Sequence, residues 1–540
     1  MPDPATVAAD YVEAVFARTR TPIEPPGFAV DWDDRPARFS TRPDAVRLTL
    51  PTQSVPPART GKLDLAALSR MLLLSYGVLA RRLRLNWNDL TLATASLSRA
   101  VWGRGTPSGG GLYPLEIYWA SGPGGPLLPG LYHYSVGHHA MERLVVGDRT
   151  GPLRRALLGH PGAADTDQFL VVTARFWRNA FKYDNFSYHV IGQDLGALLG
   201  SWEALSGRLG VELEYVLWFA DEALNRLLGL RTDEESTLAV VPLPWAPPPT
   251  ATPANAPVTV TTVGGGPPPA IRHQAYELSR RVRRFPLADA VSRATLVDRQ
   301  PRPAPPAGAG ASPAADPADG RAITLPLPEP GTSDVEAVLC ARRSSFGNFR
   351  AAPPLSQVDL ATVLASAARA RDHRTDLRAP TGRPHLTRLS IVVNRVTGLA
   401  TGSYRYDPGR HRLVTVREGP VGTLLQRSYQ LLNYNLDQLG AVVAIVGRPG
   451  PAIDAYGARG YRVLNAEVGV VAQATYLAAT GAGIGCGAVL GLDNLAMNEL
   501  LGLTGTDERS MLFLLLGHEP RVPAELRAVL VPADRPGAPS

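Results

Sequence analysis

The sequence predicts an α+β protein made of two tandem copies of one unit, and three observations lead to this prediction. Short motifs recur at a nearly constant offset along the chain. A stretch rich in proline, alanine and glycine separates the two sets of motifs. Each set lies in the same pattern of helix, strand, strand and helix, without the regular strand–helix alternation of a doubly wound fold. A chain of 540 residues is also long enough for two or more domains.

The repeat is clearest in two pairs of strings. Gly130-Leu-Tyr-His-Tyr134 recurs as Gly402-Ser-Tyr-Arg-Tyr406, and the difference in numbering is 402 − 130 = 272. Asn225-Arg-Leu-Leu-Gly229 recurs as Asn498-Glu-Leu-Leu-Gly502, and the difference is 498 − 225 = 273. The string that begins at Asp64 recurs at Asp359, where the difference is 359 − 64 = 295. The first copy is therefore expected to carry an insertion of about 22 (295 − 273) before Pro107.

Hydrophobic periodicity places the elements within each copy. In the first copy we expect a buried helix, a strand, a hairpin-like pair of strands, another strand and a long buried helix, over residues 63–80, 115–120, 131–134 with 141–146, 168–174 and 187–209. In the second copy we expect two strands and the long helix at residues 389–394, 441–447 and 461–480. Each copy should therefore form an antiparallel or mixed sheet with helices on both sides.

The two copies are joined by a linker. Residues 246–269 and 301–320 are rich in proline, alanine and glycine and too poor in large apolar side chains to pack a core. Between them, residues 270–284 could form a short basic helix, either a solvated surface helix or a binding element. The predicted organisation is an N-terminal domain over residues 1–245, a linker with a short helix over 246–320, and a C-terminal domain over 321–540.

Composition narrows the class of protein. The 55 lysines and arginines against 48 acidic residues give a net charge of +7, but the arginines are scattered, so we expect no nucleic-acid partner. Cys340 and Cys486 lie far apart and indicate no disulfide framework, which fits a cytoplasmic setting. We expect no signal peptide and no membrane span, because residues 468–492 are interrupted by Gln473 and by glycines. His138-His139 has no third ligand nearby, so we expect no metal.

Lys182 is a candidate catalytic residue. The chain has only two lysines, Lys62 and Lys182, and the other 53 basic residues are arginine (55 − 2). Lysine can lose its proton when it is desolvated, whereas arginine stays protonated. Lys182 is followed by a second titratable group, Tyr183. The second copy has Ala455 in place of the lysine but retains the tyrosine as Tyr456.

Two further motifs belong to different copies. Residues 107–111, Pro-Ser-Gly-Gly-Gly, would let the backbone approach a flat ligand and offer N–H donors, unless they form only a mobile loop. Their counterpart at residues 380–384, Pro-Thr-Gly-Arg-Pro, is filled by arginine and proline. The string Arg342-Arg343-Ser344 suits a phosphate, unless it is only surface charge, and its expected counterpart near residues 46–50 has lost the arginine pair. A glycine cluster at residues 481–487 also belongs to the second copy.

Each copy therefore lacks what the other keeps, which favours one composite site between the copies over two independent sites. The absence of a G-x-G-x-x-G string after a strand leaves a Rossmann-type nicotinamide site unsupported.

The strings PSGGGLYPLE, GLYHY, FKY, ARRSSF and GIGCG resemble the nitroreductase superfamily, and within it the SagB-type (ThcOx-like) azoline dehydrogenases of ribosomal peptide natural-product (RiPP) pathways. Members of that family are normally homodimers with FMN at the subunit interface. The resemblance implies two tandem nitroreductase-like domains, each an FMN-binding α/β sandwich, that form an intramolecular pseudo-dimer.

The resemblance also implies roles for individual residues. The FMN phosphate would be held by Arg342, Arg343 and Ser344, with Arg521 nearby at the C-terminal end. The isoalloxazine ring would be lined from the second copy by Gly483, Ile484 and Gly485, and from the first copy by Pro107, Ser108, Gly109 and Gly110. Lys182 and Tyr183 match the catalytic Lys-Tyr pair of these dehydrogenases, and either could be the base. Because each copy lacks part of the set, a second FMN is in doubt.

The implied reaction is the FMN-dependent oxidation of peptidyl thiazoline or oxazoline rings to thiazole or oxazole. The implied partners are an azoline-containing precursor peptide, a cyclodehydratase, and molecular oxygen as electron acceptor. One alternative is a flavin-dependent NAD(P)H reductase of nitro compounds or quinones, because one fold supports many functions. A second alternative is a flavin-free scaffold that binds a peptide or partner enzymes.

Overall fold

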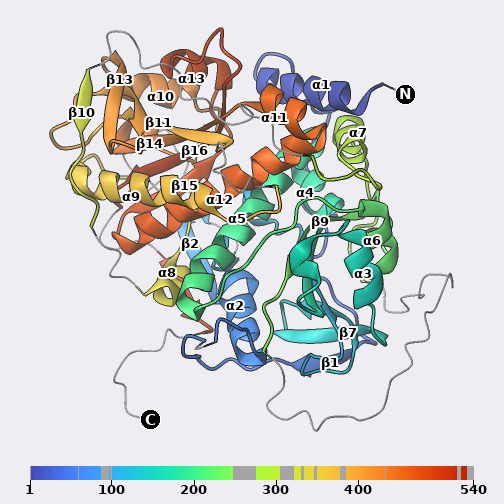
Figure 1. Cartoon of the computed structure of the whole chain (residues 1–540). Coiled ribbons are helices and arrows are strands. Elements are labelled where there is room, and N and C mark those ends of the chain that lie inside the picture. Colours follow the sequence, from blue (N-terminus) through green and yellow to red (C-terminus); the bar gives the residue numbers. More distant parts are fainter. Residues whose placement is uncertain are drawn as a thin grey trace.

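In the computed structural model, two antiparallel sheets flank a central pair of long helices (Figure 1). The structure describes residues 2–58, 60–86, 96–97, 100–246, 275–303, 321–329, 334–345, 349–377, 385–431, 433–519 and 525–531. The helices are α1 (Pro4–Ala17), α2 (Leu65–Tyr76), α3 (Thr150–Ala156), α4 (Phe176–Tyr183), α5 (Ser187–Leu209), α6 (Asp221–Leu227), α7 (Pro286–Ala294), α8 (Val335–Ala341), α9 (Gln357–Arg369), α10 (Gly422–Ser428), α11 (Pro449–Tyr456), α12 (Arg459–Gly481) and α13 (Asn494–Leu500).

The first domain contains a sheet with strand order β1-β7-β6-β5-β8-β9. Its strands are β1 (Val46–Thr49), β5 (Leu115–Ser121), β6 (Gly130–Ser135), β7 (Ala140–Val146), β8 (Gln168–Arg175) and β9 (Glu235–Pro242). Every residue of β5 is buried, as expected for a strand covered on both faces.

The second domain repeats this sheet with strand order β10-β13-β12-β11-β14-β16-β15. Its strands are β10 (Ala322–Thr324), β11 (Thr387–Val393), β12 (Gly402–Asp407), β13 (Arg412–Glu418), β14 (Ala441–Gly447), β15 (Gly485–Val489) and β16 (Arg509–Gly517). The β1–β7 pair of the first domain corresponds to the β10–β13 pair of the second. The predicted equivalence between residues 46–50 and the arginine string is therefore wrong, because residues 46–50 form the edge strand that β10 forms in the other copy.

A third, smaller sheet joins the two domains. Strand β2 (Ala80–Asn86) pairs with β17 (Glu525–Val529), with β3 (Ser96–Leu97) and with β4 (Val101–Gly103). Strands β2 to β4 lie in the region where the repeat offset predicts extra residues in the first copy. The insertion thus brings the C-terminal strand of the chain onto the first domain.

The duplication extends to individual hydrogen bonds. Tyr134 Oη lies 2.8 Å from His139 Nδ1, and Tyr406 Oη lies 2.7 Å from His411 Nδ1 at the equivalent place in the second copy. Helices α4 and α11 have the same length and begin at equivalent positions of the repeat. These matches show that the two domains share one fold and are related by the duplication.

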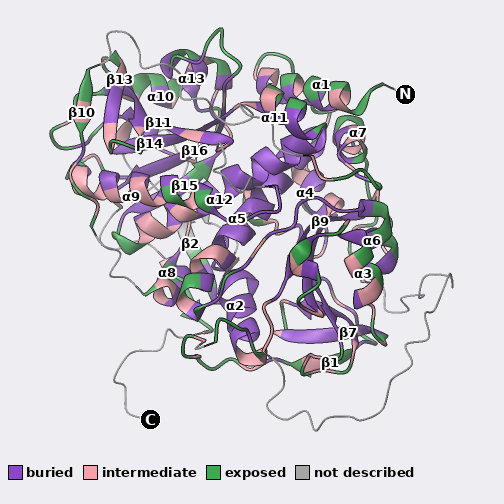
Figure 2. Cartoon of the chain, viewed as in Figure 1, coloured by how far each residue is buried: buried purple, intermediate pink, exposed green. Residues whose placement is uncertain are grey.

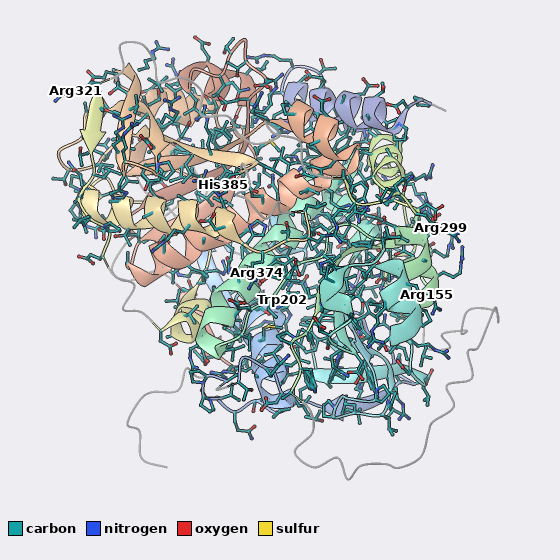
Figure 3. All side chains as sticks on the ribbon, in the orientation of Figure 1. Arg155, Trp202, Arg299, Arg321, Arg374 and His385 are labelled. Atoms are coloured by element: carbon teal, nitrogen blue, oxygen red, sulfur yellow. The ribbon has the colours of Figure 1, made fainter. Side chains whose placement is uncertain are left out.

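Helices α5 and α12 cross at the centre of the pseudo-dimer and are buried along most of their length (Figure 2). The crossing depends on two equivalent glycines. A Cβ atom on Gly196 would lie 1.9 Å from the carbonyl oxygen of Ala466, and one on Gly469 would lie 2.1 Å from that of Gln193. Since one core cluster contains apolar residues of both domains, the two copies pack as a single unit. In Figure 3, Trp202 of α5 lies in this interior, while Arg155, Arg299 and Arg321 lie towards the edges.

The predicted strands and the predicted long helices over residues 187–209 and 461–480 match β5 to β8, β11, β14, α5 and α12 to within a few residues. The helix predicted over 63–80 ends earlier, at Tyr76, and Gly77 follows it. The helix predicted over residues 270–284 is wrong for the described residues 275–284, which are not helical. The helix begins instead at Pro286, a residue suited to a first helical turn. Within the described part of the chain, none of the helices has the length and apolar content to cross a membrane.

Candidate functional site

A cavity of about 690 Å³ lies between the two domains and is walled by both. Such a volume suits a cofactor or a drug-sized ligand. Of the residues predicted for a site, those that line it are Pro107, Ser108, Gly109, Gly110, Lys182, Tyr183, Arg342, Arg343 and Ser344. The structure thus brings the Lys-Tyr pair and the glycine loop of the first copy to the arginine string of the second.

Lys182 and Tyr183 end helix α4 at the cavity wall. Burial lowers the pKa of Lys182 below its usual range, and burial raises the pKa of Tyr183 well above its own. The Lys182 ammonium lies 4.9 Å from the centre of the Tyr183 ring. Within the residues that the structure describes, no carboxylate pairs with Lys182. The site therefore favours a lysine that can lose its proton beside a tyrosine that keeps its own.

The glycine loop is held against this pair by Asp194 of α5. Asp194 accepts hydrogen bonds from Ser108 Oγ (2.6 Å) and from the Gly109 N–H (2.7 Å). Gly110 has φ +62°, and a Cβ atom there would lie 2.9 Å from both Lys182 Nζ and Tyr183 Oη. Only glycine therefore permits this approach of the loop to the two side chains.

Asp194 is a cavity residue that the sequence did not single out as functional. It lies among apolar residues of α5, and burial raises its pKa to about 7 although Ser108 and Gly109 donate hydrogen bonds to it. In the sequence, Asp194 stands out only because Tyr188 and Asp194 recur as Tyr461 and Glu467 in the second copy. Its partner became evident only when the fold brought residues 108 and 194 together.

A cluster of arginines also lines the cavity. Arg342 is buried, and its Nη2 donates to the Arg104 carbonyl oxygen (2.9 Å). Within the described chain, Arg342 Nε and Nη1 and Arg104 Nε are buried without a hydrogen-bond partner. Arg82 lies beside them, and burial together with the charge of Arg342 lowers its pKa to about 10. Buried donors without partners and mutual repulsion between guanidinium groups favour an anion at this cluster.

The other two members of the predicted phosphate string have protein partners. Arg343 forms a bidentate pair with Glu519, with one contact of 2.9 Å. Ser344 Oγ lies 3.0 Å from Tyr476 Oη. Both line the cavity, but among the described arginines of the cavity the buried donors without a hydrogen-bond partner belong to Arg342, Arg104 and Arg82. Arg82 and Arg104 were not predicted, because they follow the first-copy helix α2 and reach Arg342 only through the fold.

The glycine cluster of the second copy does not line the cavity. Ile484 is buried, and a Cβ atom on Gly485 would lie 2.7 Å from both Ser345 Oγ and Glu519 Cγ, so these two residues pack behind the wall, whereas Gly483 is exposed. The segment after them supplies the lining instead, with Ala488, Val489, Leu490 and Gly491. Arg521 and residues 380–384 lie outside the described residues.

Described residues of the chain itself occupy part of the position that the duplication relates to this cavity. Leu217 and Trp218 are the counterparts of Leu490 and Gly491 in the repeat. Their backbone N–H groups donate to the buried carboxylate of Asp376, at 2.7 and 3.1 Å. The N–H groups of Leu217 and Trp218 are thus bound to an acidic side chain, whereas their counterparts Leu490 and Gly491 line the cavity.

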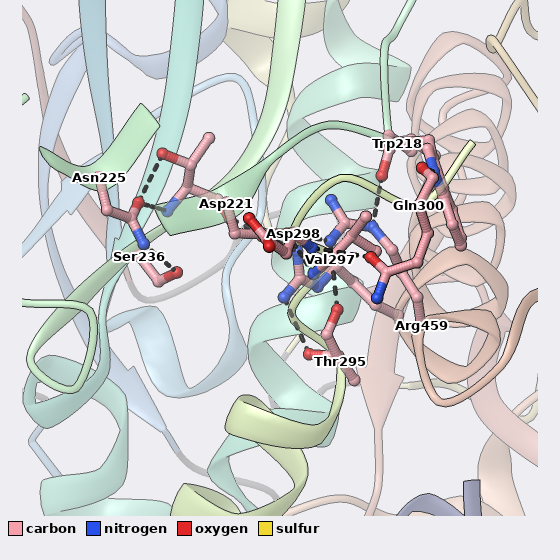
Figure 4. A network of polar contacts seen from close by, with 12 residues as sticks. Trp218, Asp221, Asn225, Ser236, Thr295, Val297, Asp298, Gln300 and Arg459 are labelled. Carbon is pink, nitrogen blue, oxygen red and sulfur yellow. Dashed lines mark hydrogen bonds and ion pairs between the residues drawn. The ribbon is translucent and has the colours of Figure 1, made fainter. Parts of the chain in front are cut away.

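A network of buried ion pairs and hydrogen bonds links the residues at this second position (Figure 4). Arg459 corresponds to the cavity residue Phe186 and donates to Asp221 Oδ2 (2.5 Å), to the Thr295 carbonyl oxygen (3.1 Å) and to the Leu217 carbonyl oxygen (2.6 Å). The Trp218 indole N–H donates to the Gln300 carbonyl oxygen (3.0 Å). Part of the segment predicted as linker therefore fills the second position.

Comparisons with known proteins agree with this architecture. Residues 340–518 match the model of the family described as "Nitroreductase family". A nitroreductase-like protein of Methanocaldococcus jannaschii is 29% identical over 188 residues, which cover 34% of this chain and 91% of that protein. The crystal structure of a nitroreductase-like protein from Anabaena variabilis superposes with a TM-score of 0.72 at 26% identity, covering 95% of this chain and 99% of that one.

The structural match to the Anabaena variabilis protein spans both domains, and the family match falls on the second. Together, these findings show that the second domain matches the nitroreductase family and that the whole chain has a fold similar to that of a nitroreductase-like protein.

Proposed function

We propose that the protein is an FMN-dependent dehydrogenase that oxidises thiazoline or oxazoline rings in a peptide to thiazole or oxazole. The observation that carries this proposal is the half-buried Lys182, which lines a cavity between the domains and has no acidic partner among the described residues. A reduction by NAD(P)H needs no such base, whereas forming an aromatic azole requires removal of a proton from a ring carbon.

The residues present fit FMN. Arg342, whose buried donors lack partners in the described chain, would hold the phosphate together with Arg104 and Arg82. The glycine loop at residues 107–111 would pack against the flat ring, since Gly110 leaves no side chain in the way. FMN, when bound, would accept the hydride of the substrate and pass two electrons to molecular oxygen.

The side chains of the first domain would handle the proton. Lys182 would take the proton from the ring carbon derived from Cα, since burial brings the pKa of its ammonium down towards the working range. Tyr183 would remain protonated and orient the ring by donating a hydrogen bond, because burial raises its pKa. We further propose that a cyclodehydratase supplies the azoline peptide and that the reaction takes place in the cytoplasm.

The decisive experiment is anaerobic mixing of the purified yellow protein with a synthetic thiazoline peptide. We expect loss of the oxidised-flavin absorbance and a product that is two hydrogens lighter. The Lys182→Ala variant should still bind the flavin. The azoline peptide should reduce this flavin at least a hundredfold more slowly, in line with the loss of a general base. Lys62→Ala is the matched control, because Lys62 is the other lysine of the chain and is exposed. Protein without flavin, or flavin that azoline peptides leave oxidised, would refute the proposal.

The second candidate is a flavin-dependent NAD(P)H reductase of nitro compounds or quinones. The nitroreductase names of the similar proteins favour it. Fast NAD(P)H oxidation with a nitroarene, unaffected by Lys182→Ala and without turnover of azoline peptides, would establish it instead.

A further inference from the structure

Residues 275–284 run along the surface of the first domain; exposed and half-buried side chains alternate over residues 275–280, and residues 281–284 are all exposed. Tyr276, Leu278 and Val282 are 63%, 53% and 53% exposed, and the side chain of Arg280 is 83% exposed. An exposed period of two is typical of extended chain. We call Tyr276, Leu278, Arg280 and Val282 the outer row. Three large apolar side chains so close together in sequence form an exposed patch of the kind that marks an interaction site.

The other side of this segment is fastened to the protein. The Trp177 indole N–H donates to Ser279 Oγ (2.9 Å), and Arg175 lies 3.4 Å from the Glu277 carboxylate. The Tyr276 N–H donates to the Thr41 carbonyl oxygen (3.1 Å). The outer row is therefore held in one extended conformation, which lowers the entropy that a partner would have to remove on binding.

The outer row is joined through Asp34 to a segment that lines the large cavity. The Asp34 carboxylate accepts hydrogen bonds from the N–H groups of Arg280 (2.6 Å) and Arg281 (3.0 Å). Asp34 lies in the segment of residues 32–38, of which Trp32, Arg35 and Arg38 line the cavity. The Trp32 ring packs at 5.2 Å against Phe181, the residue before Lys182.

A second, smaller cavity lies beside the row. It has a volume of about 190 Å³ and is bordered by Val282, Phe285, Trp177 and Ala288, with Arg283 and Arg284 at its edge. A cavity of about 150 Å³ can hold a benzene-sized group. The space therefore suits one large apolar side chain of a docked partner.

The charge of this surface indicates the partner. Arg280, Arg281 and Arg283 are all exposed, and the cavity-lining segment around Asp34 adds Arg35 and Arg38. Exposed apolar and basic side chains along an extended chain complement an extended peptide that carries apolar and acidic side chains.

We propose that the outer row docks an extended segment of the peptide substrate, rich in acidic and apolar residues, and so holds a distant ring of the same peptide at Lys182. This inference rests on the proposed function in that the substrate is a peptide. It adds a recognition surface outside the cavity and a chemical class for the bound segment.

The test is fluorescence anisotropy of the flavin-loaded full chain with a fluorescein-labelled twelve-residue probe of alternating Glu and Leu. We expect binding that weakens with salt, and much weaker binding of a Lys-Leu probe of the same length. Replacing Tyr276, Leu278 and Val282 together by serine should raise the Kd of the Glu-Leu probe at least tenfold, and Arg280→Glu should raise it severalfold. The matched control is Leu128→Ser, which alters an equally exposed apolar residue, 63% exposed, outside this segment.

The proposal is overturned if the triple variant binds the probe as the wild type does, or if both probes bind equally. A wild-type dimer that the triple variant converts to a monomer would show that the row binds a second copy of the chain, and would also overturn it. Because the probe contains no azoline, its binding does not depend on turnover. Row-dependent binding without azoline oxidation would refute only the proposed function. Azoline oxidation with an unchanged KM in the triple variant would refute only the docking surface.

Discussion

The carboxyl group of Asp194 should make the stability of the protein depend on pH, and Asp194→Asn should remove that dependence. Asp194 is buried beside the glycine loop, and burial raises its pKa from 3.8 to about 7. Between these two pH values the folded state binds a proton that the unfolded chain has lost. The stabilisation is complete below pH 4, declines as the pH rises towards 7, and is lost above pH 7.

The size of the effect follows from the shift. A difference of about 3 pKa units (7 − 3.8), at about 1.4 kcal/mol per unit, corresponds to about 4 kcal/mol. About two of these units lie between pH 5 and pH 7, so wild type should lose about 3 kcal/mol relative to Asp194→Asn between pH 5 and pH 8. The asparagine amide can still accept from the Gly109 N–H and donate to Ser108 Oγ, so the loop should keep its position.

The assay is urea unfolding of both proteins, without flavin, followed by tryptophan fluorescence at pH 5 and pH 8. The quantity of interest is the stability of Asp194→Asn minus that of wild type, because the other titrating groups cancel in this difference. Asp3→Asn is a surface control, for which the difference should change by less than about 0.5 kcal/mol. If the Asp194→Asn difference is the same at both pH values, Asp194 does not titrate in this range and the reasoning is wrong.

The cavity and its filled counterpart lead to three further predictions. Arg342→Ala should lower the content of bound flavin at least tenfold, measured by absorbance after gel filtration, while wild type should bind one flavin per chain because Asp376 fills the related position. Asp221→Ala should lower the free energy of unfolding, measured with urea, by about 3–5 kcal/mol, because it leaves the buried Arg459 and Arg462 without their carboxylate partner. Gly110→Ala should slow azoline oxidation at least tenfold, measured by stopped flow, since the new methyl group would lie 2.9 Å from Lys182 Nζ, and it should cost about 1–2 kcal/mol of stability because φ at this position is +62°.

The parts of the structure that could be predicted from sequence are those carried by local pattern. Period-two and buried runs located the strands, and the constant offset between pairs such as Gly130 and Gly402 revealed the duplication, because equivalent residues keep equivalent packing. Contacts between distant segments could not be predicted in the same way. The pairing of Arg343 with Glu519 and the contact of Arg342 with Arg104 each join parts of the chain that no local pattern connects.

The linker illustrates a different limit. Residues 275–284 have a basic composition that a helix could carry, yet they lie extended, because Glu277 and Ser279 find partners on the first domain. Composition records how polar a segment is, but the backbone conformation here is set by contacts with Trp177 and Asp34. Tertiary contacts outweigh weak local preference in such a short segment.

The presence of both copies in one chain explains how the two related positions can differ. In a symmetric dimer any side chain that fills one site fills both, so a residue such as Arg459 could not replace Phe186 at only one position. Within a single chain the two positions can carry different residues. Lys182 and Phe186 line the cavity, while their counterparts Ala455 and Arg459 are buried at the second position. The second position can then hold the buried ion pair of Arg459 with Asp221 and the segment around Thr295. The ion pair joins the two domains.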